Sequence, residues 1–143
     1  MRKITIRGEE YWEEEKPISF HIDYYLGVEA PTAEDEVERD YLFALLDRYC
    51  FLYMDDDLNT RRVVLQPKYD GNQELASCMS MIQFLVRDNI VNCYCTMRSE
   101  INTTHDWDCD TLFLLTRRVY EKYNLKSFDI YMTVNSYHRK LTN

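Results

Sequence analysis

Hydrophobic and polar residues alternate along several short segments of the chain. Alternation with a period of two is the pattern of β-strands that bury one face. It predicts strands at residues 2–7, 18–26, 62–66, 80–86, 90–97 and 128–134. The charged stretch 9–16 lacks this pattern and is predicted as a loop or turn, as are residues 67–73, which contain Asp70-Gly71.

Two other segments have the spacing of amphipathic helices. Thr32, with acidic residues directly after it, resembles a helix N-cap, and the helix is predicted to run to about residues 49–53. Its apolar stripe would consist of Val37, Tyr41, Leu45 and Leu46. A second helix is predicted over 108–123, with Leu112, Leu115 and Val119 facing inward. Together these elements predict one α+β domain spanning residues 1–143.

Composition narrows the class of protein. The chain has 143 residues, 45% of them hydrophobic, which is enough for a core without a disulfide or metal. No apolar run resembles a signal peptide or a membrane span, so we expect a cytoplasmic protein without membrane contact. The odd number of cysteines, five, favours free thiols. Cys93 and Cys95 would lie on one strand face as small buried residues, and a metal site is not expected.

Charge is distributed unevenly. The net charge is -8, which argues against binding of polymeric nucleic acid. Residues 1–59 carry six basic and sixteen acidic side chains, whereas residues 60–143 carry eleven basic and nine acidic ones. A small anionic ligand is therefore expected to bind mainly to the second part.

Cys78 is the strongest chemical candidate. It lies just before the strand 80–86, and Arg98-Ser99 ends the next strand, so a hairpin would bring them together. Nearby cations make a thiol nucleophilic, and guanidinium groups with a serine hydroxyl suit a phosphate. Arg61 and Arg62 begin a further strand. The alternative is that these arginines only keep the surface soluble.

The order of these motifs resembles a known family. Thr60-Arg61-Arg62, Ala76-Ser77-Cys78, Gln83-Phe84, Met97-Arg98-Ser99 and Asp129-Ile130-Tyr131 follow one another as in the catalytic half of the thymidylate synthase family, which includes the deoxycytidylate and cytidylate hydroxymethylases. The resemblance implies a mixed β-sheet with helices packed on one face and a homodimer formed through the sheet. A small acidic relative of this kind would suit a virus or phage.

The resemblance also implies residue roles in binding a pyrimidine nucleoside monophosphate. Cys78 would be the nucleophile that adds to C6 of the ring, so that C5 can attack a one-carbon unit carried by methylenetetrahydrofolate. The implied binding residues are Arg98 and Ser99 for the phosphate, Arg61 and Arg62 for the phosphate of the partner subunit, Tyr131 for the sugar, and Gln83 behind the nucleophile.

The sequence departs from the family at the base and folate sites. Residues 105–109 replace the segment that reads the base, and Asp108 or Asp110 would either complement a cytosine amino group or cap a helix. Ile101 stands where a folate-binding aspartate is expected. Two functions therefore remain open: a methyl- or hydroxymethyltransferase acting at C5, or a non-catalytic relative that binds a nucleotide or a protein partner. A third reading is an accidental resemblance with an inert, buried Cys78.

Overall fold

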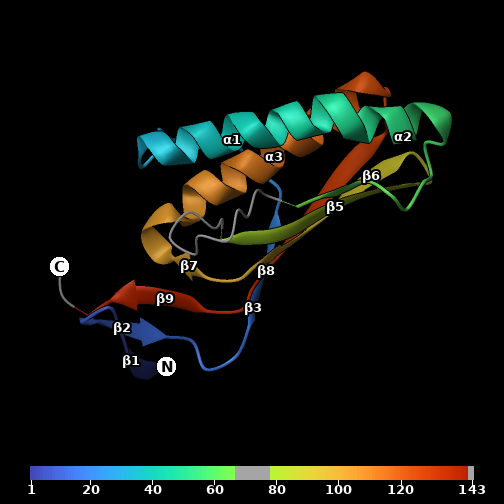
Figure 1. Ribbon diagram of the computed structural model, residues 1–143. Helices are drawn as coiled ribbons and strands as arrows, with labels where there is room; N and C mark the ends of the chain where they lie inside the picture. Colours follow the sequence, from blue (N-terminus) through green and yellow to red (C-terminus); the bar gives the residue numbers. More distant parts are fainter. Residues whose placement is uncertain (67–77, 142–143) are drawn as a thin grey trace.

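The computed structural model describes residues 1–66 and 78–141, which form an α+β structure with two mixed β-sheets (Figure 1). The five-stranded sheet has the order β3 (Ile18–Ile22), β8 (Ser127–Val134), β6 (Ile90–Met97), β5 (Met79–Arg87) and β4 (Val64–Leu65). The four-stranded sheet has the order β1 (Arg2–Ile6), β2 (Glu9–Glu13), β9 (Tyr137–Lys140) and β7 (Glu100–Ile101). The turn predicted at 67–73 lies outside the described residues.

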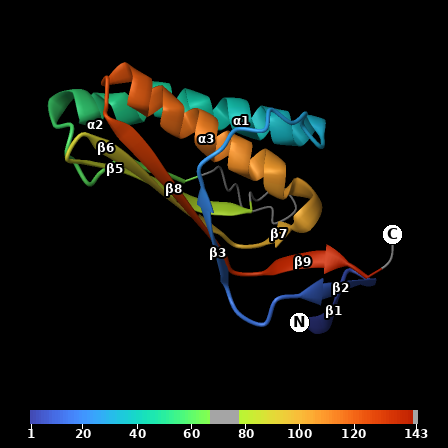
Figure 2. The ribbon, with the colours of Figure 1, turned by 180° about the vertical axis from the view of Figure 1, so that it is seen from behind.

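The helices lie together on one face of the five-stranded sheet (Figures 1 and 2). They are α1 (Ala33–Leu45), which continues through the π-helical turn Leu46–Cys50 into α2 (Phe51–Asp56), and α3 (His105–Lys122), which follows the 3₁₀ turn Asn102–Thr104. The core between these layers contains Phe84, Ile130 and Met132, all fully buried. The predicted inward positions of α3 and the burial of Cys93 and Cys95 are confirmed. None of the described helices crosses the opposite face of this sheet.

The first helix begins where the sequence predicts, but its apolar stripe is different. Thr32 caps it, since the Asp35 amide donates to the Thr32 hydroxyl at 3.2 Å. Val37 is 67% exposed and Tyr41 37%, so the predicted stripe is wrong at its first two positions, whereas Leu46 is buried as predicted. The side chains that reach the core are Leu42, Leu46, Cys50 and Met54. The predicted stripe and the buried set share a four-residue spacing. The spacing alone therefore cannot show which set faces the core.

Two strand predictions need correction. The charged segment predicted as a loop contains β2, which pairs with β1 and β9 in a largely solvated sheet where an alternating apolar face is unnecessary. Arg7 and Gly8 turn the chain between β1 and β2 with φ of 50° and 81°. The strand predicted over 18–26 ends at Ile22. Strands β7 and β9 were not predicted.

The start of α3 also differs from the prediction. The helix begins at His105 rather than at residue 108, so Asp108 and Asp110 lie inside it instead of capping it. Among the helices of the described ranges, none combines the length and the hydrophobicity needed to cross a lipid bilayer.

Candidate functional site: the Cys78 region

Three of the predicted site residues meet where β5 begins and β6 ends. The Arg98 amide donates to the Cys78 carbonyl at 2.6 Å, which continues the antiparallel pairing of Met79 with Met97. The Ser99 hydroxyl lies 3.7 Å from Cys78 Sγ, and Arg98 Nη2 lies 3.8 Å from it. The predicted meeting of Cys78 with Arg98 is therefore confirmed.

Cys78 is the most accessible of the five cysteines, all of which lie in the described part of the chain and are free. It is partly buried, whereas the other four are buried. Burial raises the pKa of Cys50 and of Cys93 to about 12, and burial together with neighbouring acidic groups also raises the pKa of Cys95 and Cys109. The four buried thiols are therefore poor nucleophiles near neutral pH, and Cys78 is the one cysteine that a ligand could reach.

The residue after Cys78 lines a small cavity between the N-terminal turns of α1 and α3. The cavity has a volume of about 20 Å³, roughly that of a single water molecule, so only a small group could enter it. Its lining consists of Asp35, Glu38, Arg39, Leu42, Met79, Trp107, Asp108 and Thr111. Sequence reasoning missed the acidic residues of α1, because acids in a first turn are explained by the helix dipole alone.

Arg39 is held firmly in this cavity wall. Its guanidinium carbon lies 3.2 Å from the centre of the Trp107 ring, Nε donates to the Thr111 hydroxyl at 2.8 Å, and Nη2 donates to the Trp107 carbonyl at 3.1 Å. These contacts fix Arg39 between α1 and α3 and cover one face of the indole ring.

A buried group of polar side chains extends from the cavity. Glu100 has a fully buried side chain, and its Oε1 is 2.7 Å from His105 Nδ1. His105 Nε2 is 3.3 Å from Cys109 Sγ. Burial, with the Glu100 carboxyl second, raises the pKa of Asp108 to about 10, and burial also raises the pKa of Glu100. Burial lowers the pKa of His105. Burial where β7 meets the start of α3 therefore disfavours the charged forms of Asp108, Glu100 and His105.

Asp110 serves a different part of the chain. Its two carboxylate oxygens accept hydrogen bonds from the Leu26 and Val28 amides, both at 2.9 Å, and the residue is 1% exposed. The loop after β3 is thereby anchored to α3. Of the two aspartates considered for base recognition, only Asp108 lines the cavity beside Met79.

The double arginine lies at the far end of the β4–β5 pair. Val64 pairs with Gln83, so at about 3.3 Å per residue Arg62 lies roughly 20 Å from Cys78 along the sheet. Gln83 donates to the Arg61 carbonyl at 3.2 Å, which ties β5 to the chain entering β4. A single chain therefore does not bring Arg61, Arg62 or Gln83 to Cys78.

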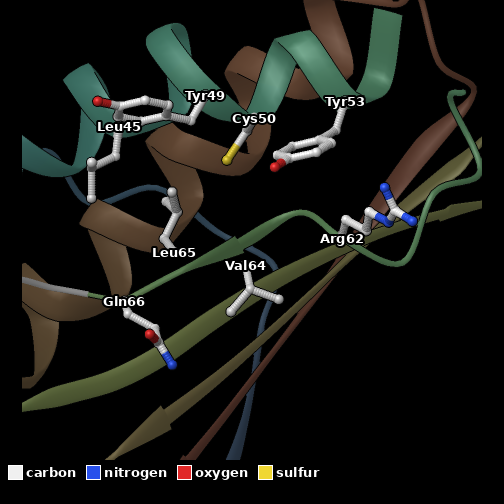
Figure 3. A pocket seen from close by; sticks show the side chains of 8 residues that line it. All are labelled: Leu45, Tyr49, Cys50, Tyr53, Arg62, Val64, Leu65 and Gln66. Carbon is white, nitrogen blue, oxygen red and sulfur yellow. The ribbon is translucent and has the colours of Figure 1, made fainter. Parts of the chain in front are cut away.

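Arg62 instead borders a groove of about 220 Å³ between β4 and the helices above it (Figure 3). Cys50 Sγ is directed toward the groove from the helical side, and Val64 extends from the strand (Figure 3). The full lining is Leu45, Tyr49, Cys50, Tyr53, Arg62, Val64, Leu65 and Gln66. This groove is larger than the cavity beside Met79, but Arg62 is the one predicted site residue in its lining.

Tyr131 lies on the sheet face that no described helix covers. It stacks on His21 at 4.9 Å and on Tyr94 at 5.6 Å between ring centres, and both tyrosines are 41% exposed. His21 Nε2 lies 3.3 Å from Asp129 Oδ1. The Tyr131 side chain therefore belongs to a half-exposed aromatic row that crosses β3, β8 and β6.

Within residues 1–66 and 78–141, the His, Cys, Asp and Glu side chains form no group of three that could coordinate a metal ion. No protein-family model and no curated protein matches the chain, so the geometry of the Cys78 region is the basis for assigning it a function.

Proposed function

We propose that the chain binds a pyrimidine nucleoside monophosphate next to Cys78, and that the thiol adds reversibly to C6 of the ring. The observation that carries this proposal is the convergence of Arg98 Nη2 and the Ser99 hydroxyl on the most accessible thiol. A guanidinium and a hydroxyl suit a phosphate, and a nucleotide held by them would lie within reach of the sulfur.

The chemistry of the addition needs no further reactant than water. The sulfur forms a bond to C6, the electron pair of the C5–C6 double bond moves to C5, and C5 takes a proton from water. Loss of the original C5 proton and departure of the sulfur restore the ring. The net result is exchange of the C5 hydrogen with solvent.

Transfer of a one-carbon unit has weaker support. Ile101 in β7 gives an apolar side chain where the family resemblance expects a carboxylate, and one face of Trp107 is covered by Arg39. The described residues thus do not fit methylenetetrahydrofolate. We derive no folate-dependent step, and binding with reversible addition is the function proposed here.

Calorimetric titration with dUMP, dCMP and CMP, each compared with its nucleoside, tests the proposal. We expect binding that requires the phosphate and weakens about tenfold or more in Arg98→Ala, since a hydrogen bond to a charged group contributes about 1.5–3 kcal/mol. Arg48→Ala, which removes an exposed arginine of the helical face, is the matched control and should leave affinity unchanged. The proposal is refuted if none of the three nucleotides binds.

Exchange of the C5 proton tests the covalent step separately. With tritium- or deuterium-labelled nucleotide, the wild type should release the label to water, and Cys78→Ala should release none while still binding. A protein that binds nucleotides without exchange would be a nucleotide sensor rather than an enzyme.

We further propose that the chain forms a homodimer with sites shared between subunits. The roughly 20 Å between Arg62 and Cys78 supports this, since these arginines could contribute to a Cys78 site only if that site belongs to another copy. The half-exposed row of His21, Tyr131 and Tyr94 offers a surface for such pairing. Mixing Cys78→Ala chains with Arg61→Ala/Arg62→Ala chains should restore some exchange activity, and no restoration would argue against shared sites.

A protein-interaction module is the second candidate. The same aromatic row on the uncovered sheet face favours it, because half-exposed rings are typical of interfaces. If the folded protein binds none of the three nucleotides, the protein-interaction module becomes the favoured function.

A further inference from the structure

A second row of apolar side chains runs along the first helix, directly beside the row that reaches the core. We call it the helix-edge stripe, and its members are Val37, Tyr41, Leu45, Tyr49 and Tyr53. They follow one another at intervals of four residues through α1, the π-helical turn and α2. At 1.5 Å per residue the stripe is about 24 Å long. The apolar pattern that the sequence shows in this helix therefore has two parts, and only one of them is used by the core.

The stripe is exposed because it lies on the side of the helix that faces neither the sheet nor α3. On the α3 side, Phe43 lies 4.5 Å from the Arg118 guanidinium, and the Phe51 and Tyr123 rings are 5.9 Å apart. On the side of the stripe, Tyr49 is 52% exposed, and Leu52, three positions further along the helix, is 68% exposed. Contiguous exposed apolar side chains of this kind mark surfaces that bind another molecule.

The second half of the stripe borders the groove beside β4. Leu45, Tyr49 and Tyr53 form its helical side, and Val64 lies on the strand side (Figure 3). The groove volume of about 220 Å³ is below the roughly 300–1,000 Å³ of small-molecule pockets, so it suits an inserted side chain better than a whole small ligand. The concave end of the stripe therefore favours a protein partner.

The shape of the surface favours a helical partner over an added strand. Strand β4 has only two residues, which is a short template for pairing with an extended peptide. The stripe, in contrast, continues along the helix for about 24 Å, and an amphipathic helix of about 16 residues would match this length.

The charge of the helix indicates what kind of helix would bind. From the start of α1 to the end of α2 the chain has eight acidic side chains and two basic ones. Glu34, Asp40 and Asp56 are exposed and lie three residues from Val37 or Tyr53, so they are neighbours of the stripe near both of its ends. Arg62 adds one cation at the groove. A partner with basic side chains around an apolar centre would be complementary to this arrangement.

The same charges disfavour the other occupants of such a surface. In a symmetric pair of chains formed through the stripe, acidic residues would face one another at both ends. Nucleic acid and the surface of an anionic membrane carry negative charge and would also be repelled.

We propose that the helix-edge stripe binds a basic amphipathic helix of another protein. The partner inserts an apolar side chain into the groove beside β4 and places arginine or lysine residues near Glu34, Asp40 and Asp56. Arginine side chains of the partner also gain by stacking on the exposed tyrosine rings. This surface is separate from the aromatic row on the uncovered sheet face, and the inference does not depend on nucleotide binding.

Fluorescence anisotropy with a defined peptide tests the proposal. The probe is a labelled peptide of about 18 residues, made of leucine and arginine, with leucines at three- and four-residue intervals. The comparison peptide has the same composition in an order that gives no apolar face. We expect the patterned peptide to bind at micromolar concentrations and the scrambled one at least about tenfold more weakly. Equal binding of the two peptides, or binding of neither, would overturn the inference.

Variants of the chain locate the binding surface. Tyr53→Ala and Leu52→Ala should each weaken binding about fivefold or more, because they remove exposed apolar side chains of the stripe and its border. The triple variant Glu34→Gln/Asp40→Asn/Asp56→Asn should weaken it about three- to tenfold and reduce its dependence on salt. Tyr24→Ala is the matched control, since Tyr24 is as exposed as Tyr53 but follows β3 at the opposite edge of the sheet.

Two further measurements keep the test independent of how the variants fold. Amide chemical shifts of the wild type should change on peptide addition mainly between residues 34 and 56, and changes confined to other segments would overturn the inference. Light scattering examines the second copy as occupant. A lower mass for Leu52→Glu/Tyr53→Glu than for the wild type would assign the stripe to a contact between copies and would also overturn it, whereas an equal mass is expected.

Discussion

Asp110 provides the most direct test of how the fold is held together around the site. Its carboxylate accepts hydrogen bonds from the Leu26 and Val28 amides, both at 2.9 Å, and Asp110 itself is only 1% exposed. These bonds join residues more than eighty positions apart. They anchor the loop between β3 and α1 to α3, the helix that borders the small cavity beside Met79.

Replacing Asp110 removes a charged acceptor and leaves two amides without a partner. A hydrogen bond to a charged group contributes about 1.5–3 kcal/mol, so Asp110→Ala should lower the free energy of unfolding by about 3–5 kcal/mol. Asp110→Asn keeps one acceptor but places an NH₂ group against the second backbone amide. It should lower the free energy of unfolding by about 2–3 kcal/mol. A loss of this size would be a large part of the stability of a domain of this length.

Equilibrium unfolding in urea measures these changes, and hydrogen exchange locates them. The Leu26 and Val28 amides should exchange much faster in both variants, while the amides of β6 should change only with global stability. Asp106→Asn is the matched control, because Asp106 is an exposed acid of the same helix and should cost no more than about 1 kcal/mol. The reasoning is refuted if Asp110→Ala loses no more stability than this control and the two amides stay protected.

Three further predictions concern the thiols, pH and assembly. Under native conditions one thiol per chain should react rapidly with a maleimide or a disulfide reagent, Cys78→Ser should abolish that reaction, and rapid labelling of more thiols would contradict the burial of the other four. Asp108 has a folded-state pKa of about 10 against an ordinary value of 3.8, so its contribution to stability is fully present below pH 3.8 and is lost as pH rises toward 10. Urea unfolding should therefore show wild-type stability falling between neutral and alkaline pH relative to Asp108→Asn, by up to about 1.4 kcal/mol per pH unit, and parallel curves would exclude the shift. Tyr131→Arg should turn the proposed dimer into a monomer in light scattering without loss of fold, and an unchanged mass would contradict a dimer formed through the uncovered sheet face.

The sequence predicted well where local pattern and geometry coincide. The alternation on either side of Asp88-Asn89 predicts a hairpin, and a hairpin of that length necessarily returns Arg98 to Cys78. Both turn residues have positive φ, at 52° and 62°, as a tight connection of this kind requires. This pairing made the candidate site accessible to sequence reasoning.

The parts that were missed depend on contacts between distant segments. The role of Asp110 requires knowledge that the loop at Leu26 passes over α3, which no local pattern contains. The pairing of β2 with β9 joins segments from opposite ends of the chain and has no apolar alternation to reveal it. The contact of Glu100 with His105 was hidden because each residue alone has an ordinary explanation in a strand or a first helical turn.

The π-helical turn Leu46–Cys50 has a consequence for how this helix could vary. In a regular α-helix, residues four apart advance by about 400°, so a stripe with that spacing drifts by about 40° at each step. Each residue of the π-helical turn rotates less about the helix axis, which offsets part of this drift. Leu42, Leu46, Cys50 and Met54 therefore stay over the same part of the sheet. Deleting one residue within the turn would rotate everything after it by about 100° and would carry Met54 out of the core. We therefore expect the length of this segment to be restricted more strictly than the identity of its exposed side chains.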